Sequence, residues 1–448
     1  MYTAFKRTLA LLIPLSLAWI TIIPTLFRKD PPTRWELHKN IRQTRPSPPS
    51  PALSMLAAAP DWNALEIYQN TISREEFERL LTTVFTTGNA WQTCIKIDAN
   101  EARINTGAAS TDPVFRLRFA LTGLTATAPR HWRTASELPP ATPEKPLAGL
   151  KIAIDPGHIG GAWAKMEERW FVVGTGTPVR EGDLTLRVAN LLKPRLEALG
   201  ATISLVRAKT EPVTPIRPHA LQSLARDSSA PDDSPAALQR LAERLFYRTA
   251  EIRARADLVN QSLKPDLVLC LHFNAEAWGD PIQPLLIDRT HLHLLLNGAY
   301  TDEEVMLADQ RFALLQKLLQ RTHQEEILVG TAVADTFAEA SGLPPYVYPP
   351  DSGSVRPIVG HPYLWVRNLL ANRLYDCPVI FMEPYVMNST IDYARIQAGD
   401  YDGLREIAGK LHPSIFREYA DSLAAGLAKS YSSRRSAEKI IPSPRDSR

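Results

Sequence analysis

The chain has 448 residues, of which 44% are hydrophobic and 22% charged, and its formal net charge is +3. This length suits two or three domains, and the composition is that of a globular protein. The small net charge excludes the strongly basic surface of a nucleic-acid-binding protein, so we expect no nucleic acid as a partner. The cysteines, Cys94, Cys270 and Cys377, are too few for a disulfide framework, and we expect buried small side chains.

The first 30 residues have the pattern of an export signal. Lys6 and Arg7 precede an apolar stretch from Leu9 to Phe27, which ends in three charged residues. An apolar stretch of about 19 residues just suffices to cross a bilayer, and its flanks are basic on both sides. We therefore expect residues 1–30 to be a signal segment or an anchor in the cytoplasmic membrane, with cleavage left open. The protein is expected to be exported to the periplasm or cell envelope.

Two proline-rich stretches, residues 31–60 and 128–148, are expected to be linkers on either side of a small α/β module at residues 61–127. Within the module, Ser73 and an apolar stripe predict a helix from Ser73 to Phe85. The alternation in residues 91–107 predicts a hairpin. The module contains no recognisable chemistry, so its role stays open, with packing or interaction as the simplest reading.

The sequence pattern changes at residue 149, from where short apolar runs alternate with helical segments. This alternation predicts an α/β fold. Strands are expected at residues 150–155, 201–207, 266–273 and 377–385. Helices are expected at residues 184–200, 236–263 and, for the most part, 302–341. We expect this domain to span residues 149–433 and a disordered tail to occupy residues 434–448.

Four polar residues lie where an α/β fold concentrates its chemistry. His158 follows the first expected strand of this domain, and His272 and Glu383 lie at the ends of two later strands. Glu181 lies just ahead of the first long helix. In open α/β sheets, ligand sites gather at the carboxyl ends of the strands, which makes these four residues the candidate site.

The side chains of this candidate site suit a catalytic metal ion. A catalytic zinc ion takes three protein ligands and keeps one position open for water. Two imidazoles and one carboxylate leave the ion positive, so that it lowers the pKa of bound water and polarises a substrate carbonyl. We therefore expect His158, Glu181 and His272 to hold one Zn²⁺ ion. Glu383 is expected to be the general base and acid.

The sequence around these residues resembles the zinc-dependent N-acetylmuramoyl-L-alanine amidases of bacterial cell-wall remodelling. The matching runs are KIAIDPGHIGG, REGDLTLRVANLLKPRLEALGATISLVR, EIRARADLVNQSLKPDLVLCLHFNA and CPVIFMEPYVMN. The resemblance implies a twisted, mostly parallel sheet of about six strands flanked by helices. It also implies one zinc ion at His158, Glu181 and His272, with Glu383 catalytic. The implied reaction is hydrolysis of the amide bond between N-acetylmuramic acid and L-alanine, with peptidoglycan as the partner.

The sequence departs from the family pattern at several points. Ile159 interrupts the usual His-Gly-Gly of the first motif, and a long loop separates His158 from Glu181. Pro384 and Tyr385 stand where the last motif usually has a small residue and glycine. No ligand position is lost, but the substrate and the regulation, including any protein activator, are left open.

Further polar residues near the motifs are candidates for secondary roles. Asn274 is expected to bind substrate or to brace its loop, and Arg367 to bind a peptide carboxylate or to form a surface ion pair. His291 and His293 share one face of a strand, either as a half-exposed surface or in contact with the substrate. Asp155 is expected to bond the backbone of the first motif or an imidazole.

Other functions compete with amide hydrolysis at muramic acid. A zinc carboxypeptidase or another peptidoglycan peptide hydrolase would use the same zinc chemistry, so the sequence discriminates poorly between them. A non-catalytic cell-wall-binding protein is disfavoured because all four polar positions are filled. A glycoside hydrolase also uses two carboxylates but needs no pair of histidines.

Overall fold

A computed structural model of the chain describes residues 53–107, 112–121, 126–230 and 232–436. All of these described residues belong to one compact unit. The expected signal or anchor at residues 1–30 lies outside the described residues, as does most of the expected tail, from residue 437 onward. The expectation of disorder was wrong for residues 434–436, because they continue the helix Ile415–Ser436 and Arg434 pairs with Glu325. Within the described ranges, no helix is both long and apolar enough to cross a membrane.

The centre of the unit is a seven-stranded sheet in the order β10-β11-β9-β12-β8-β4-β7. Its strands are β4 (Lys151–Pro156), β7 (Thr202–Leu205), β8 (Leu267–Leu271), β9 (Leu292–Leu296), β10 (Val355–Pro357), β11 (Leu364–Arg367) and β12 (Val379–Pro384). Strands β7, β4, β8 and β12 are parallel neighbours, β9 runs antiparallel to β12, β11 is parallel to β9, and β10 is antiparallel to β11. The predicted α/β class and mostly parallel sheet are confirmed, with seven strands rather than about six.

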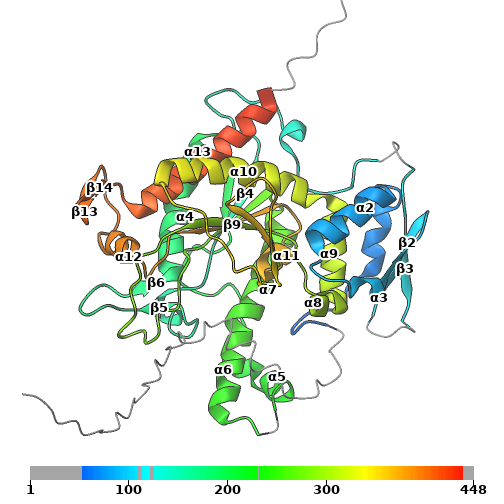
Figure 1. Cartoon of the computed structure of the whole chain (residues 1–448), viewed down its shortest axis with the longest axis horizontal. Helices are drawn as coiled ribbons and strands as arrows, with labels where there is room; N and C mark the ends of the chain where they lie inside the picture. The colour runs from blue at the N-terminus through cyan, green and yellow to red at the C-terminus, as the bar shows by residue number, and fades with distance from the viewer. Residues whose placement is uncertain (1–52, 108–111, 122–125, 231, 437–448) are drawn as a thin grey trace, which may run out of the picture. The chain divides into compact units, whose positions relative to one another are not determined.

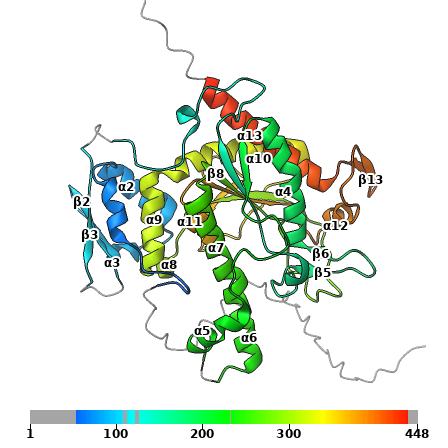
Figure 2. The same ribbon diagram turned by 180° about the vertical axis from the view of Figure 1, so that it is seen from behind.

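Helices cover both faces of this sheet (Figures 1 and 2). One face packs against α4 (Glu181–Ala198), α10 (Thr322–Ser341) and α13 (Ile415–Ser436), of which α10 and α13 lie side by side. The other face packs against α7 (Glu251–Asp257), η7 (Leu258–Leu263) and α11 (Leu370–Leu374). A strand buried on both faces needs apolar residues at every position, and the five residues of β8 are all buried and apolar.

The segment predicted as a small module contains η1 (Trp62–Tyr68), α2 (Arg74–Leu80), η2 (Leu81–Phe85), α3 (Trp91–Cys94), β1 (Ile95–Ile97), β2 (Glu101–Asn105) and β3 (Val114–Arg118). The predicted helix is present, and the Ser73 hydroxyl caps it by accepting a bond from the Glu76 amide at 3.2 Å. The predicted hairpin is present as the antiparallel pair β1–β2. This segment lies beside α9 (Ala308–Gln320), and Arg321 at the end of α9 pairs with Glu76 (Figure 1).

The predicted linker at residues 128–148 is instead packed against the rest of the unit, because its apolar side chains are buried, with Trp132 3% and Leu147 0% accessible. The predicted long helical stretches are found. The helical stretch expected at 236–263 consists of α6 (Pro235–Leu245), η6 (Phe246–Ala250), α7 and η7, and the stretch at 302–341 consists of α8 (Asp302–Met306), α9 and α10. The three cysteines are free and buried, as expected. The remaining elements are η3 (Ala135–Glu137), η4 (Gly161–Trp163), β5 (Trp170–Phe171), β6 (Val179–Arg180), η5 (Pro218–Leu221), α5 (Gln222–Asp227), α12 (Thr390–Gln397), β13 (Arg405–Ile407) and β14 (Lys410–His412).

Candidate metal centre

The sheet topology brings the four predicted site residues to one edge. Because β4, β8 and β12 are parallel neighbours, their carboxyl ends meet at the same edge. His158 lies two residues beyond β4, His272 directly follows β8, and Glu383 is the penultimate residue of β12. The fourth, Glu181, is the first residue of α4, which packs against β4 and β8.

Three of these residues form a group that can hold a metal ion. One ligand atom each from His158, Glu181 and His272 lies within 4.8 Å of the other two. The Glu181 carboxylate lies 3.2 Å from His158 Nε2 and 3.0 Å from His272 Nδ1. The rings of the two histidines meet edge to face at 5.1 Å between centroids. Gly157 makes this approach possible, because a Cβ there would lie 2.3 Å from the His272 ring.

The charges of the group favour an ionised Glu181. Burial opposes its charge, but the two histidines outweigh that cost and hold the pKa of Glu181 well below its usual range. Burial also opposes protonation of His158, yet the neighbouring Glu181 and Glu167 raise the pKa of His158. The pKa of His272 is lowered, chiefly by burial. Glu181 therefore supplies a negative charge to the group.

Glu167, from the long loop that departs from the family pattern, supports His158. Its carboxylate accepts bonds from the backbone amides of Ile159 at 2.9 Å and Gly160 at 3.0 Å, and it lies 3.5 Å from His158 Nδ1. Burial works against the charge of Glu167, but the contact with His158 and these amides lowers its pKa. A carboxylate behind a metal-binding imidazole fixes the orientation of the ring. Sequence reasoning missed this role, because nothing marks Glu167 as buried.

The backbone at His158 is held in an uncommon conformation. Its φ is +60°, in the left-handed region that residues with a Cβ seldom adopt. The buried Arg255 stabilises the turn by donating to the carbonyls of His158 at 2.8 Å and Pro156 at 2.9 Å. Arg255 is held in turn by Asp155 at 2.9 Å and Glu251 at 2.8 Å. Asp155 thus acts on the first motif through Arg255, and not by bonding the turn backbone or an imidazole.

Arg169 lies against the ligand atoms themselves. Its Nε lies 3.2 Å from Glu181 Oε2 and donates to His158 Nε2 at 3.3 Å. A metal ion would use the same carboxylate and the same nitrogen lone pair, since it binds the neutral imidazole. The guanidinium therefore competes with a cation for this group. This contact could not be predicted from the sequence, because Arg169 is one of several charged residues in the loop.

Glu383 lies one strand away from His272 and is partly buried. Burial of its carboxyl and the nearby charge of Glu181 raise its pKa to about 8, although His158, Arg169 and Arg367 act in the opposite direction. A carboxyl that titrates near neutral pH can both accept and donate a proton under physiological conditions.

The two predicted substrate-binding residues lie on either side of β12. Asn274 continues the pairing of β8 with the chain after β12: it bridges to Val386, and its carbonyl accepts the Met387 amide at 2.8 Å. Its side chain accepts the amide of Ala275 at 2.7 Å, so bracing of the loop is what the structure displays. Arg367 ends β11 and lies near Tyr348, whose phenol feels its positive charge.

His293 lies on β9, the strand next to β12, and His291 directly precedes β9; the centroids of the two rings are 5.9 Å apart. The expectation of a half-exposed surface was wrong, because only 6% of His291 and 2% of His293 is accessible. The cause is the segment at Tyr346 and Tyr348, whose rings cover both imidazoles. Its position against β9 could not be read from the sequence.

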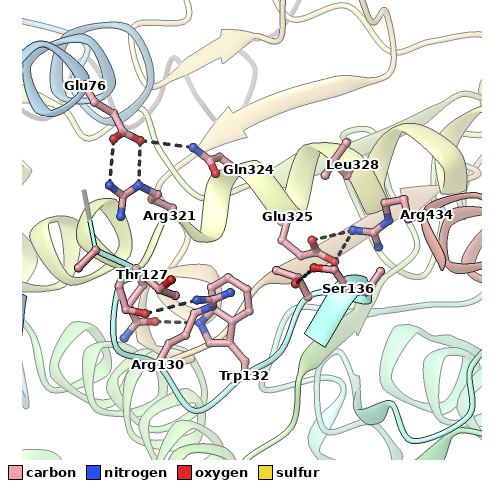
Figure 3. Close-up of a pocket in the computed structure, with 15 residues that line it drawn as sticks. Glu76, Thr127, Arg130, Trp132, Ser136, Arg321, Gln324, Glu325, Leu328 and Arg434 are labelled. Atoms are coloured by element: carbon pink, nitrogen blue, oxygen red, sulfur yellow. Dashed lines mark hydrogen bonds and ion pairs between the residues drawn. The ribbon is translucent and has the colours of Figure 1, made fainter. Parts of the chain in front are cut away.

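A separate cavity of about 630 Å³ contains none of the candidate site residues (Figure 3). It is lined by residues of α2, α10, α13 and the stretch 126–136. Its arginines are paired: Arg321 with Glu76, Arg434 with Glu325, and Arg130 with Glu137. The cavity thus offers no uncompensated charge and is not a second candidate centre.

No protein-family model and no curated protein matches the sequence. Solved structures similar to this chain include the N-acetylmuramyl-L-alanine amidase Ami1 from Mycobacterium smegmatis, with 17% identity and a TM-score of 0.35 over 64% of this chain and 99% of that chain. The CwlD amidase from Clostridioides difficile, solved in complex with the GerS lipoprotein, has 12% identity and a TM-score of 0.34 over 63% and 99%. The N-acetylmuramoyl-L-alanine amidase AmiC2 of Nostoc punctiforme has 14% identity and a TM-score of 0.33 over 64% and 98%. Because identities and TM-scores this low do not establish function, we infer the function from the site residues.

Proposed function

We propose that this chain is a zinc-dependent N-acetylmuramoyl-L-alanine amidase, which hydrolyses the amide bond between N-acetylmuramic acid and L-alanine in peptidoglycan. The observation that carries the proposal is the grouping of His158, Glu181 and His272 at one sheet edge, with Glu383 on the neighbouring strand. These residues lie within the sequence runs that resemble the amidase family.

The donor set fits zinc better than calcium or magnesium. Two imidazole nitrogens and one carboxylate are ligands of catalytic zinc sites, whereas the hard cations prefer oxygen ligands. The ionised Glu181 supplies the negative charge, and the site needs no further protein ligand, which leaves a position for water and substrate. When bound, zinc would act as a Lewis acid that acidifies water and polarises the scissile carbonyl.

The protein's own groups then move the proton. The Glu383 carboxylate accepts a proton from the attacking water and delivers it to the amide nitrogen, which leaves as the free amino group of the stem peptide. The raised pKa of Glu383 makes both transfers accessible near neutral pH. Glu167 holds the His158 ring in place, and Arg255 holds the backbone turn that carries it.

The proposed function requires that the protein be exported across the cytoplasmic membrane. Peptidoglycan lies outside the cytoplasmic membrane, so residues 1–30 would direct export or anchor the chain, and residues 31–60 would tether the enzyme within reach of the wall. On this proposal residues 149–433 are the catalytic domain, and 61–127 is an accessory module. A protein activator would act on the catalytic domain from outside.

Digestion of purified peptidoglycan tests the proposed function. We expect the zinc-loaded protein to release intact stem peptides with a free L-alanine amino terminus, identified by mass spectrometry. A zinc chelator should abolish the release, and added zinc should restore it. Shortened stem peptides would instead identify a carboxypeptidase or another peptide hydrolase. Binding to the wall without any zinc-dependent product would identify a non-catalytic wall-binding protein.

Removal of the competing arginine is expected to tighten zinc binding. Arg169→Met frees Glu181 and His158 from the guanidinium, and we expect the zinc dissociation constant to fall about threefold to tenfold, which corresponds to one net charged hydrogen bond. Competition with a chromophoric chelator at pH 7 measures it. Arg248→Gln is the control, since Arg248 contacts Glu168 of the same loop, at 3.7 Å, and none of the proposed ligands. Weaker zinc binding in Arg169→Met would mean that Arg169 orders the ligands and does not compete.

A further inference from the structure

A cluster of five aromatic and imidazole rings lies next to Glu383. This ring cluster consists of His291, His293, Tyr346, Tyr348 and Trp365. His293 is the direct antiparallel partner of Glu383 in the sheet. Directly paired side chains on neighbouring strands have Cβ atoms about 5 Å apart. The cluster therefore lies directly beside Glu383, the proposed general base and acid.

The rings of the cluster are held in fixed positions. Tyr346 lies over both imidazoles, at 4.5 Å from His291 and 4.9 Å from His293 between centroids. The hydroxyl of Tyr348 bonds His293 Nε2 at 3.1 Å, and its ring packs against Trp365 at 5.0 Å. The backbone of Tyr346 is fixed on both sides, by Leu292 O at 3.0 Å and by the Trp365 indole at 3.2 Å. A preformed surface of this kind loses little conformational entropy when a ligand binds.

The members of the ring cluster differ in how much of each side chain is accessible to solvent. The two histidines are almost fully buried, whereas Tyr346 and Tyr348 are partly accessible. Burial, together with the positive charges of its neighbours, keeps the pKa of His293 well below its usual value, so its imidazole is neutral. Tyr346, Tyr348 and Trp365 thus supply the accessible part of the cluster.

One polar group borders this face. The Glu276 carboxylate lies 3.8 Å from His291 Nε2 and 3.7 Å from the exposed Arg289. A carboxylate next to an aromatic face is the pair of features that a pyranose ring requires, because its C–H face is apolar and its rim carries hydroxyl or amide donors. The Glu276 carboxylate lies next to Arg289, so a cationic group of a peptide would find no unpaired carboxylate there.

We propose that the ring cluster binds a sugar ring of the glycan strand, with the accessible face of Tyr346 as the stacking platform and Glu276 as the acceptor for a hydroxyl or amide group. This subsite rests on the proposed function, because it presupposes a substrate with a sugar on one side of the scissile amide. It places that sugar on the β9 side of Glu383. The peptide side then lies toward α4 and the loop of Arg169.

Two substrates with the same amide bond test the subsite. One is the N-acetylglucosaminyl-N-acetylmuramoyl peptide, and the other is the N-lactoyl peptide of the same sequence, which lacks the sugar. The readout is the ratio of kcat/KM on the two substrates for the zinc-loaded full chain. We expect Tyr346→Ala to lower this ratio about threefold to tenfold, the contribution of one aromatic contact. Tyr346→Phe, which keeps the ring, is the matched variant and should retain the ratio.

Binding of the peptide-free disaccharide separates this proposal from the proposed function. Calorimetric titration of N-acetylglucosaminyl-N-acetylmuramic acid should give binding to the unsubstituted chain and to Tyr346→Phe, with at least threefold weaker binding to Tyr346→Ala. If neither substrate is hydrolysed but this pattern is found, the amidase proposal fails and the sugar subsite stands. An unchanged ratio and equal disaccharide binding in Tyr346→Ala would overturn the subsite. Equal losses on both substrates would also overturn it, since they would reveal a purely structural role.

Discussion

Replacement of Glu383 by glutamine is expected to reduce amide hydrolysis about 10²-fold to 10⁴-fold while zinc remains bound. Glutamine has nearly the same shape but cannot accept the proton of the attacking water. The three proposed ligands do not include Glu383, so the metal site should be intact. The release of stem peptides measures the loss of hydrolysis, and the zinc content of the purified variant measures whether the metal site is retained. A loss of zinc together with activity would place Glu383 among the ligands and contradict the proposed division of roles.

The same substitution is expected to stabilise the metal-free protein, and more so at pH 8 than at pH 5. The unfolded chain releases the Glu383 proton near its ordinary pKa of 4.5, whereas the folded protein holds it until about pH 8. Between these values the folded state binds more protons than the unfolded state, so the stability of the unsubstituted chain falls as pH rises. Glutamine removes this pH-dependent cost, which amounts to a few kcal/mol at most.

Urea unfolding of the metal-free proteins at both pH values measures this effect. Glu197→Gln is the control, because Glu197 is a surface partner of Lys193 and should change the free energy of unfolding by less than about 1 kcal/mol. The same stability difference for Glu383→Gln at pH 5 and pH 8 would show that Glu383 is already ionised in the fold. The ionised Glu383 would then not lower the free energy of unfolding.

The candidate site could be predicted from the sequence because its residues interrupt strong local patterns. His272 and Glu383 end apolar runs that are buried strands, and Glu181 begins an amphipathic helix. A polar residue at such a boundary is conspicuous, and the α/β topology then gathers these boundaries at one edge. The alternation of strands and helices follows from the same periodicity, whereas the mostly parallel sheet was implied by the resemblance to the amidase family and is observed in the pairing of β4, β8 and β12.

The supporting residues could not be predicted because their roles depend on contacts between distant segments. Arg255 looks like any arginine of a long helix, yet it is 4% accessible and contacts the turn at His158. The insertion of β9 antiparallel to β12, which sets His293 opposite Glu383, is a matter of strand order and register. Neither can be read from local hydrophobicity, since a strand of the pattern in β9 would fit either direction.

The second large effect is expected at this buried arginine. Arg255 is the common partner of two carboxylates that are themselves buried, those of Asp155 and Glu251. Tyr375 also donates to Asp155, at 2.5 Å, but a neutral phenol does not compensate a charge. Removal of one partner from a buried ion pair costs more than the pair contributes, because the buried charge left behind loses its nearest compensating charge.

We therefore expect Arg255→Met to lower the free energy of unfolding by about 3–5 kcal/mol in urea at pH 7. The turn at His158 loses its donor in the same variant, so zinc binding should also weaken, by about 10-fold to 100-fold. Lys193→Met, which removes an exposed cation from α4, is the control and should cost less than about 1 kcal/mol. Addition of Asp155→Asn to Arg255→Met should recover part of the stability but not the zinc affinity, because neutralising the carboxylate does not restore the bonds to the turn. Recovery of both the stability and the zinc affinity would contradict the role of Arg255 as the residue that positions His158. It would mean that Arg255 acts only by compensating the charge of Asp155.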